Sequence, residues 1–327
     1  MNPRDQLPDV PDPIVVLRGL TKDFGDVHAV RGIDLEVRRG EMFGLIGPDG
    51  AGKTTTMRMI TGLLAPTAGS VTTCGFAPRA ERSKLARRVG YLAQRFSLYG
   101  DLTVDENLEF FAEVQDVPNL KARRDEMLDL VRLSPFRRRL ADRLSGGMKQ
   151  KLALACTLIH TPALIILDEP TTGVDPVSRR DFWRLLAEIR RRGITIVLST
   201  PYLDEAERCS RIALFSRGAI LGVDTPDAMR AAGGAGWHEL IATPRREAER
   251  LLAAMPGVLD LEAFGERLHF RLDPRADAAA IARALHHAGV TVTALEPVRA
   301  SLEDVFLARI RASEQPDELL PAANGTH

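Results

Sequence analysis

The chain has 327 residues, and its 44 basic and 44 acidic side chains leave no net charge. This balance argues against a strongly basic nucleic-acid coat, and the 27% of charged and 45% of hydrophobic residues argue against global disorder. Three cysteines without a C-x-x-C pair support neither a disulfide framework nor a zinc site, so a reducing compartment is expected.

Residues 1–13 are polar and proline-rich and lack the apolar segment of a signal peptide, so they are expected to form a mobile tail. From residue 14 to residue 230, short apolar runs alternate with longer helical patterns. The clearest predicted strands and helices are strands 42–46, 164–167 and 195–199 and helices 53–64, 146–160 and 176–192. This alternation is typical of an α/β domain with a mainly parallel sheet, and the charged stretch at about 79–140 predicts a helical insertion within it.

The small residues at 231–236 predict a hinge, after which the pattern changes. Residues 237–311 are predicted to form a small second domain. It has the order β-α-β-β-α-β of a ferredoxin-like α+β unit, followed by a last helix over 301–311. Residues 312–327 are polar and are expected to form a second mobile tail. No apolar stretch in the sequence reaches the roughly 18–20 residues that a membrane-spanning helix needs.

A glycine-rich loop joins the predicted strand at 42–46 to the predicted helix at 53–64. It fits the pattern G-x-x-x-x-G-K-[ST] and consists of Gly47, Pro48, Asp49, Gly50, Ala51, Gly52, Lys53 and Thr54, with Thr55 directly after it. Glycines let backbone N–H groups curl around a phosphate, and the start of the helix adds its positive dipole end. Lys53 is placed to reach the β- and γ-phosphates, and the Thr54 hydroxyl to ligate Mg²⁺. The loop therefore predicts a triphosphate site, with a plain glycine-rich turn as the alternative.

A predicted buried strand ends in two adjacent carboxylates, Asp168 and Glu169. Because neighbouring residues of a strand point to opposite sides, the two acids are expected to have different roles. Asp168 suits the coordination sphere of Mg²⁺, and Glu169 is the candidate catalytic base that orients or deprotonates the attacking water. Taken alone, such a strand end could also be a solvated acidic turn.

A second anion-binding pattern precedes that strand. Ser145 is a good helix N-cap, and Gly146 and Gly147 leave backbone N–H groups free to meet an anion. In its order and spacing after the glycine-rich loop, this segment resembles the signature of ABC transporter ATPases, and the resemblance extends over residues 14–230. The run at 144–176 is especially similar to the ABC-2 exporter branch of multidrug type. The sequence SLEDVFL at 301–307 also resembles the close of the C-terminal domain in such exporters.

The resemblance implies a P-loop NTPase fold of the ABC ATPase type and three further site residues. Phe24 matches an aromatic that stacks on adenine, Gln94 matches a glutamine that senses Mg²⁺ and contacts the transmembrane partner, and Asp175 belongs to the D-loop. It further implies ATP hydrolysis with Mg²⁺ in a homodimer or heterodimer, in which the signature of one subunit meets the ATP of the other. The implied partners are ABC-2 type permease subunits, with this chain cytoplasmic and peripheral on the inner face of the cell membrane.

Three residues depart from the family pattern, and one of them, Met148 in place of the common Gln, lies outside the two glycines and is expected to cost little. Asp49 stands where the loop often has Asn, and a carboxylate there is compatible with a triphosphate only if it points outward. Pro201 stands where the family usually places a histidine that contacts the γ-phosphate, and proline supplies neither a side-chain donor nor an N–H. Its neighbours Thr200 and Tyr202 are expected to point away from the site.

Two interpretations follow from Pro201. The chain is an ATP-hydrolysing exporter subunit, or it is a degenerate ATPase half that binds ATP and pairs with a more active subunit. A third interpretation, an ABC protein that acts on nucleic acid, is disfavoured because the charge is balanced and the chain carries one ATPase domain without a long coiled-coil insertion. No nucleic-acid partner is therefore expected.

Overall fold

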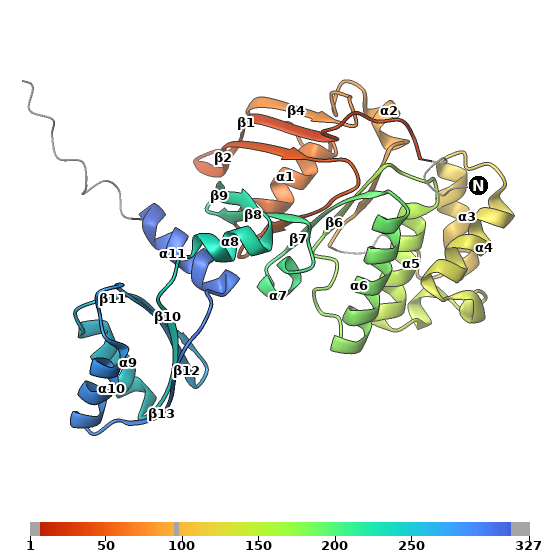
Figure 1. The fold of residues 1–327 in the computed structure, drawn as a ribbon. Coiled ribbons are helices and arrows are strands. Elements are labelled where there is room, and N and C mark those ends of the chain that lie inside the picture. Colours follow the sequence, from red (N-terminus) through yellow and green to blue (C-terminus); the bar gives the residue numbers. More distant parts are fainter. Residues whose placement is uncertain (1–6, 95–97, 315–327) are drawn as a thin grey trace, which may run out of the picture. The chain divides into compact units, whose positions relative to one another are not determined.

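The computed structural model describes residues 7–94 and 98–314, and the chain divides into two compact units after Val223 (Figure 1). Each unit has a buried apolar core of its own. Within these described ranges, none of the helices combines the length and the apolar character needed to cross a bilayer.

The first unit is built around a six-stranded sheet. In sheet order its strands are β5 (Val89–Leu92), β6 (Leu164–Asp168), β7 (Thr195–Thr200), β3 (Met42–Ile46), β8 (Arg211–Ser216) and β9 (Ala219–Asp224). The first five pair in parallel, and every residue of β3, β6 and β7 is buried. Continuous apolar runs are what strands covered on both faces require. The three strands predicted from the sequence are therefore confirmed as the centre of a mainly parallel sheet.

A second, antiparallel sheet belongs to the same unit. Its strands follow the order β2 (Val27–Val37), β1 (Val15–Phe24) and β4 (Ala68–Thr73). Helix α1 (Lys53–Ile60) contacts β2 and β4 of this sheet and β6 of the other, so it lies between the two sheets (Figure 1). The glycine-rich loop that precedes α1 is thereby held at the carboxyl end of β3.

The remaining helices of the first unit are α2 (Arg82–Ala86), α3 (Val104–Val114), α4 (Leu120–Val131), α5 (Gly146–Leu158), α6 (Pro176–Arg191) and α7 (Leu203–Ala206). Helices α3, α4 and α5 pack on one another. Helix α3 begins at a capping box, in which the N–H of Glu106 donates to the Thr103 hydroxyl and the N–H of Thr103 donates to the Glu106 carboxylate.

The stretch predicted as a helical insertion, at about 79–140, contains a strand of the central sheet. β5 pairs in parallel with β6, and it lies so close to α5 that a Cβ on Gly90 would come within 2.6 Å of the Thr157 carbonyl oxygen. A run of four residues is too short for periodicity to separate strand from helix. The predicted insertion is therefore interrupted by β5, with the short helix α2 before this strand and helices α3 and α4 after it.

Residues 7–13 do not form a free tail. Val10 belongs to the core of the first unit and is 7% exposed, and the N–H of Arg39 donates to a carboxylate oxygen of Asp12 at 3.0 Å. One apolar residue anchors an otherwise polar stretch, so the predicted tail over residues 1–13 is wrong for residues 7–13. Residues 1–6, and residues 315–327 of the second predicted tail, lie outside the described residues.

The second unit contains an antiparallel sheet with the strand order β11 (Val258–Phe264), β12 (Arg267–Leu272), β10 (Trp237–Thr243) and β13 (Thr291–Pro297). Helices α9 (Arg245–Ala254) and α10 (Ala278–His287) bury their apolar side chains against it. This is the β-α-β-β-α-β arrangement expected from the sequence. Helix α11 (Leu302–Glu314) follows and packs on α8 (Pro226–Ala232). The structure thus groups α8 with the second unit, whereas the sequence pattern placed residues up to 230 in the first.

Candidate active site

The glycine-rich loop forms one wall of a cavity of about 240 Å³. At two positions of the loop a neighbouring backbone carbonyl comes so close that only glycine fits. A Cβ on Gly47 would lie 2.2 Å from the carbonyl oxygen of Phe215, and a Cβ on Gly52 would lie 2.5 Å from the carbonyl oxygen of Ala29. Gly52 also has a φ of 101°, which suits glycine, at the N-cap of α1. The residues that line the cavity are Ala29, Asp49, Gly50, Ala51, Gly52, Lys53, Thr54, Thr55, Gln94 and Glu169. The loop, Gln94 and Glu169, predicted separately, therefore meet around one space.

Lys53 is folded back onto the loop. Its Nζ donates to the carbonyl oxygens of Gly47 at 2.7 Å and Pro48 at 2.8 Å and lies 3.9 Å from Oε1 of Glu169. Burial lowers the pKa of Lys53, and the carboxylates of Glu169, Asp49 and Asp168 oppose this shift. The ammonium group has no carboxylate at close hydrogen-bonding distance in this arrangement, so it can exchange the two carbonyls for phosphate oxygens.

Asp168 ends β6 and is 1% exposed. Its Oδ1 accepts a hydrogen bond from the hydroxyl of Thr54 at 2.9 Å, and its Oδ2 accepts a longer one from Tyr91 at 3.4 Å. A hydroxyl oxygen and a carboxylate oxygen side by side are the ligand types that Mg²⁺ prefers. The donor set at Thr54 and Asp168 therefore fits the predicted Mg²⁺.

Glu169 follows β6 directly and faces the cavity. Its side chain is 9% exposed, and its Oε2 accepts hydrogen bonds from Nε2 of Gln94 at 2.8 Å and from the hydroxyl of Thr172 at 3.3 Å. The residue has a φ of 48°, in the left-handed region that costs about 1–2 kcal/mol for a residue with a Cβ. The chain thus turns sharply where the candidate base is placed, and the side-chain amide of Gln94 donates a hydrogen bond to that base.

Phe24, Ser145 and Asp175 do not line this cavity in the single chain. Phe24 is 50% exposed at the end of β1, with the ammonium of Lys22 over its ring at 4.9 Å. Ser145 caps α5 by accepting from the N–H of Met148 at 3.3 Å, and the adjoining Gly146 is exposed. Asp175 caps α6, and hydrogen bonds from Ser178, with a smaller contribution from Val177, lower its pKa.

Gly147 is the position of the signature that close packing restricts to glycine. It is buried, and a Cβ at this position would lie 2.4 Å from the hydroxyl oxygen of Ser178 on α6. The start of α5 is thus packed closely against the start of α6, which Asp175 caps. The signature and the D-loop therefore form one continuous surface of the chain.

The side chains on either side of Pro201 are engaged away from the cavity. The Thr200 hydroxyl donates to Oε2 of buried Glu205 at 2.6 Å, and the guanidinium of Arg179 lies over the Tyr202 ring at 4.6 Å. This agrees with the alternation expected from the sequence. Glu205 also accepts hydrogen bonds from Thr171, Arg179 and Trp183, so the turn after β7 is fixed to α6.

Sequence reasoning missed two residues of this region, Tyr91 and Ser199. Ser199 is fully buried and bonds to both Asp168 and Glu169. The available signal was its place on a predicted strand two residues before Pro201, on the same side by strand alternation. The missing information was which residue of β6 lies opposite it.

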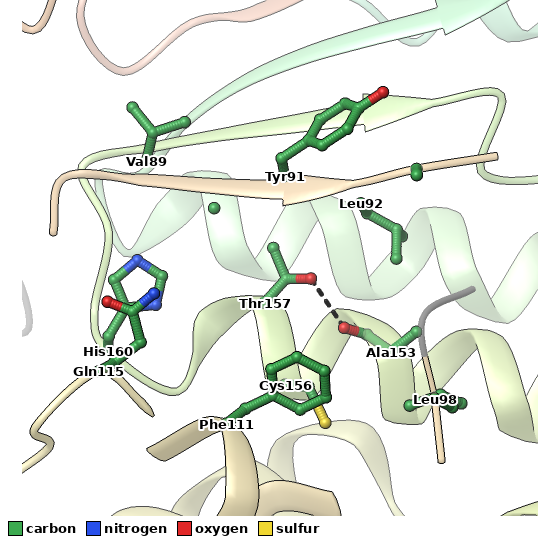
Figure 2. Close-up of a pocket in the computed structure, with 12 residues that line it drawn as sticks. Val89, Tyr91, Leu92, Leu98, Phe111, Gln115, Ala153, Cys156, Thr157 and His160 are labelled. Carbon is green, nitrogen blue, oxygen red and sulfur yellow. Dashed lines mark hydrogen bonds between the residues drawn. The ribbon is translucent and has the colours of Figure 1, made fainter. Parts of the chain in front are cut away.

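A second cavity, of about 170 Å³, lies between β5, α3 and α5 (Figure 2). Its lining includes Ala93 and Leu98, which flank the segment after Gln94, and it is closed on the α3 side by Phe111. Two aromatic residues near its edge, Tyr99 and Phe110, are 46% and 36% exposed and stack edge to face with ring centroids 4.7 Å apart.

His160 is a half-buried polar residue at the second cavity. Burial is the main reason that its pKa falls to about 4, so the ring is neutral at pH 7. Its Nε2 has no hydrogen-bond partner among the described residues. Figure 2 draws His160 and Gln115 together at one end of the cavity, with Cys156 and Phe111 along another wall. The cavity thus has both apolar and polar walls, and Nε2 of His160 is a buried polar atom in it.

Comparisons with known proteins agree with this geometry. Residues 30–172 match the family model described as ABC transporter, and residues 238–310 match the C-terminal domain of DrrA1-3-like ATP-binding proteins. The chain is 45% identical to the probable multidrug ABC transporter ATP-binding protein YbhF of Escherichia coli strain K12, over 74% of this chain and 42% of YbhF. It is 36% identical to the daunorubicin/doxorubicin resistance ATP-binding protein DrrA of Streptomyces peucetius, over 89% of this chain and 90% of DrrA.

A solved structure shares the fold of the first unit. The ATP-binding cassette MJ0796, described as dimeric and in a post-hydrolysis state bound to ADP and Pi, matches with a TM-score of 0.59 and 26% identity over 64% of this chain and 98% of that one. The chain spans less than half of YbhF but nearly the whole of DrrA, which it matches across both units. The chain therefore belongs to the family of ABC transporter ATP-binding proteins and carries a DrrA-like C-terminal domain.

Proposed function

We propose that this chain binds ATP with Mg²⁺ and hydrolyses it to ADP and phosphate, and that it thereby energises an ABC-2 type membrane exporter. One observation carries the proposal: Lys53, Thr54, Gln94 and Glu169 line the same cavity, while Asp168 bonds to Thr54 at 2.9 Å. A phosphate-binding loop and a base therefore face each other across a space of about 240 Å³.

The chain's own residues divide the work of hydrolysis. The backbone N–H groups at the start of α1 bind the β-phosphate, and Lys53 turns from the loop carbonyls to the β- and γ-phosphate oxygens. Glu169 accepts a hydrogen bond from the attacking water and takes its proton as the water oxygen bonds to the γ-phosphorus. The bond between the γ-phosphorus and the β,γ-bridging oxygen breaks in the same step, and ADP leaves with that oxygen. For the proton transfer, Gln94 must release Oε2 of Glu169, to which it donates at 2.8 Å.

Thr54, Asp168 and Gln94 are the residues that would hold Mg²⁺. When bound, the ion neutralises charge on the β- and γ-phosphates. The Thr54 hydroxyl donates a hydrogen bond to Asp168, so the lone pairs of the Thr54 oxygen are directed away from the carboxylate. The existing hydrogen bond therefore prepares Thr54 as an oxygen ligand.

We propose further that two such cassettes enclose the nucleotide, either two copies of this chain or this chain and a second ATPase subunit. Ser145 and Gly146 are exposed at the start of α5 and do not line the cavity of their own chain. An exposed helix N-terminus attracts a phosphate, so these residues suit the γ-phosphate of a partner's ATP. Asp175, exposed at the start of α6, would lie at the same interface.

The partner on the membrane side is proposed to be an ABC-2 type permease, with the cassette on the inner face of the membrane. The second cavity (Figure 2) and the exposed rings of Tyr99 and Phe110 provide a partly apolar surface for it. This surface includes Ala93, the chain neighbour of Gln94, so a displacement of Ala93 would reach the hydrogen bond between Gln94 and Glu169.

The proposal is tested by ATP turnover of the purified chain, with Mg²⁺, in the wild type and in Lys53→Ala. Lys151→Ala is the matched control, because Lys151 pairs at 3.8 Å with Asp181 and does not line the cavity. Lys53→Ala is expected to lose measurable ATP binding and turnover, while Lys151→Ala keeps both. Equal turnover in Lys53→Ala and the wild type would overturn the nucleotide-site assignment.

Pro201 favours a second candidate function, a degenerate ATPase half that binds ATP but leaves most hydrolysis to a more active partner. Neither Thr200 nor Tyr202 replaces the missing donor, because the first bonds to Glu205 and the second lies under Arg179. Loss of one donor to a developing charge slows such chemistry by about 10²–10³-fold. Strong ATP binding with turnover that appears only after a second ATPase subunit is added would support this candidate.

A further inference from the structure

The single hydroxyl of Ser199 reaches both the carboxylate of Asp168, which ends β6, and the backbone of Glu169, which follows it. Ser199 lies on β7 opposite Asp168 in the parallel register, and its side chain is fully buried. Parallel pairing brings the carboxyl ends of the two strands to the same edge of the sheet, so the hydroxyl faces the point where β6 turns into Glu169.

The hydroxyl makes two hydrogen bonds of different kinds. It donates to Oδ1 of Asp168 at 2.7 Å and accepts from the backbone N–H of Glu169 at 2.9 Å. The first fixes a carboxylate, and the second fixes the peptide from which the candidate base projects. The sharp turn removes the N–H of Glu169 from the hydrogen-bond ladder of the sheet, and a buried N–H without a partner would cost about 1–3 kcal/mol. The hydrogen bond to Ser199 avoids that cost.

The turn at Glu169 makes this support specific. With a φ of 48°, Glu169 lies in a conformation that a residue with a Cβ adopts only when its surroundings hold it there. Release of the N–H would let the peptide relax toward ordinary strand geometry and would rotate the carboxylate away from the cavity. The hydroxyl of Ser199 opposes that relaxation.

The bond to Asp168 extends the same support to the Mg²⁺ side. Oδ1 of Asp168 accepts from both Ser199 and Thr54, at 2.7 and 2.9 Å, so the two donors lock the rotation of the carboxylate. We propose that Ser199 is a positioning residue of the hydrolytic site, which sets the carboxylate of Asp168 and the backbone of Glu169 relative to each other through one hydroxyl. This inference rests on the hydrolytic function proposed above.

The chain offers a matched control on the same strand. Thr195, at the start of β7, is also fully buried, and its hydroxyl accepts from the N–H of Gly40 at 2.9 Å. Thr195→Val removes a buried hydroxyl and leaves one N–H unpaired at the far end of the strand. It therefore reproduces the loss of stability expected of Ser199→Ala without touching either acid.

The test compares Ser199→Ala, Ser199→Thr and Thr195→Val in three measurements. The first is kcat and KM for ATP. The second is the Mg²⁺ concentration at which the affinity of the chain for ADP reaches half of its maximum. The third is amide hydrogen exchange of the segment that contains Glu169. We expect Ser199→Ala to lower kcat by about 10- to 100-fold with KM changed less than about threefold, since a displacement of about 1 Å can cost about 10²-fold. It should also raise the Mg²⁺ requirement and speed exchange at Glu169.

Ser199→Thr keeps the hydroxyl and is expected to restore kcat to within about fivefold of the wild type, as the conservative replacement should. Thr195→Val should leave kcat, the Mg²⁺ requirement and exchange at Glu169 unchanged at a similar loss of melting temperature. If Ser199→Ala behaves like Thr195→Val in all three measurements, the positioning role is overturned. If the wild type itself does not hydrolyse ATP, the proposed function fails, and exchange at Glu169 together with the Mg²⁺ requirement still decides whether Ser199 positions the two acids.

Discussion

Asp49 is the residue of the glycine-rich loop whose charge opposes that of the proposed ligand. It is exposed and lines the cavity, and its attraction to Lys53 is one of the influences that raise the lysine pKa against burial. The carboxylate thus lies at the rim, where solvent screens it. From that position its charge would repel a bound triphosphate and lower the affinity of the site for ATP.

Asp49→Asn is therefore expected to tighten ATP binding by about three- to tenfold, because it removes one negative charge near the phosphates without changing side-chain size. Isothermal titration with ATP and Mg²⁺ measures the change. Glu266→Gln, on the exposed turn between β11 and β12, removes the same charge from the other unit and should leave affinity unaltered. Weaker binding in Asp49→Asn would mean that the carboxylate contributes to the site.

Pro201 makes the rate of hydrolysis the most informative quantity at the residue scale. Since Thr200 and Tyr202 are engaged by Glu205 and Arg179, the site lacks the donor that a histidine would supply. Pro201→His is expected to raise kcat at least about tenfold at unchanged ATP affinity. Pro201→Ala separates the new donor from the removal of the proline ring. A histidine variant that gains nothing, or that loses activity, would contradict this account.

The residues that could be predicted from the sequence are those whose role depends on local spacing. Lys53 and Thr54 follow from the loop pattern, and Asp168 and Glu169 follow from a strand that ends in acids. Ser199 could not be predicted in this way, because its role depends on the register between β6 and β7, which brings residue 199 opposite residue 168. Such a register is a tertiary property and leaves no periodic trace in either strand.

At the scale of elements, the packing of α5 against β5 places His160 at a cavity. Burial lowers the pKa of its ring to about 4, whereas an exposed histidine titrates near about 6.5. Between these two values the unfolded chain binds a proton at this side chain and the folded chain does not. The free energy of unfolding must therefore decrease as the pH falls from about 6.5 toward about 4.

His160→Gln is expected to reduce the loss of melting temperature between about pH 7 and about pH 5, because the amide does not titrate. His286→Gln is the matched control, since His286 is exposed near the end of α10. Thermal unfolding followed by circular dichroism at both pH values gives the comparison. An equal loss in the wild type and in His160→Gln would show that acid sensitivity arises elsewhere.

Elements of ordinary length were predictable, whereas short or isolated ones were not. The buried runs that form β3, β6 and β7 appear in the sequence as continuous apolar segments, and the helices after them as amphipathic patterns. β5 has four residues within a charged region, and its place in the sheet is set by the contact of Gly90 with α5. Val10 is a single apolar residue, and only the tertiary structure gives it a partner surface.

At the scale of the whole molecule, the division into two units separates the nucleotide site from the C-terminal domain. Every residue that lines the nucleotide cavity precedes the division after Val223. The small residues at 231–236 predict the boundary too late in the sequence, because the structure divides after Val223. The sequence could not predict that α8 packs on α11, because that contact joins residues about seventy positions apart.

A chain that ends at Asp224, where β9 ends, is therefore expected to fold and to bind ATP within about threefold of the full chain. Circular dichroism and isothermal titration measure the two properties. An insoluble product, or one that does not bind ATP, would place part of the C-terminal unit in the folding core of the cassette.

The central claim is that two cassettes close around ATP and that hydrolysis, with Glu169 as the base, lets them open again. It is tested most directly by the oligomeric state of Glu169→Gln with ATP and Mg²⁺. The amide keeps the size of the side chain and its hydrogen bonds, but it cannot accept the proton of water. Light scattering on a sizing column should find a stable dimer with ATP and a monomer with ADP, whereas the wild type dimerises only transiently. A variant that remains monomeric with bound ATP, or that hydrolyses ATP at the wild-type rate, would contradict the account.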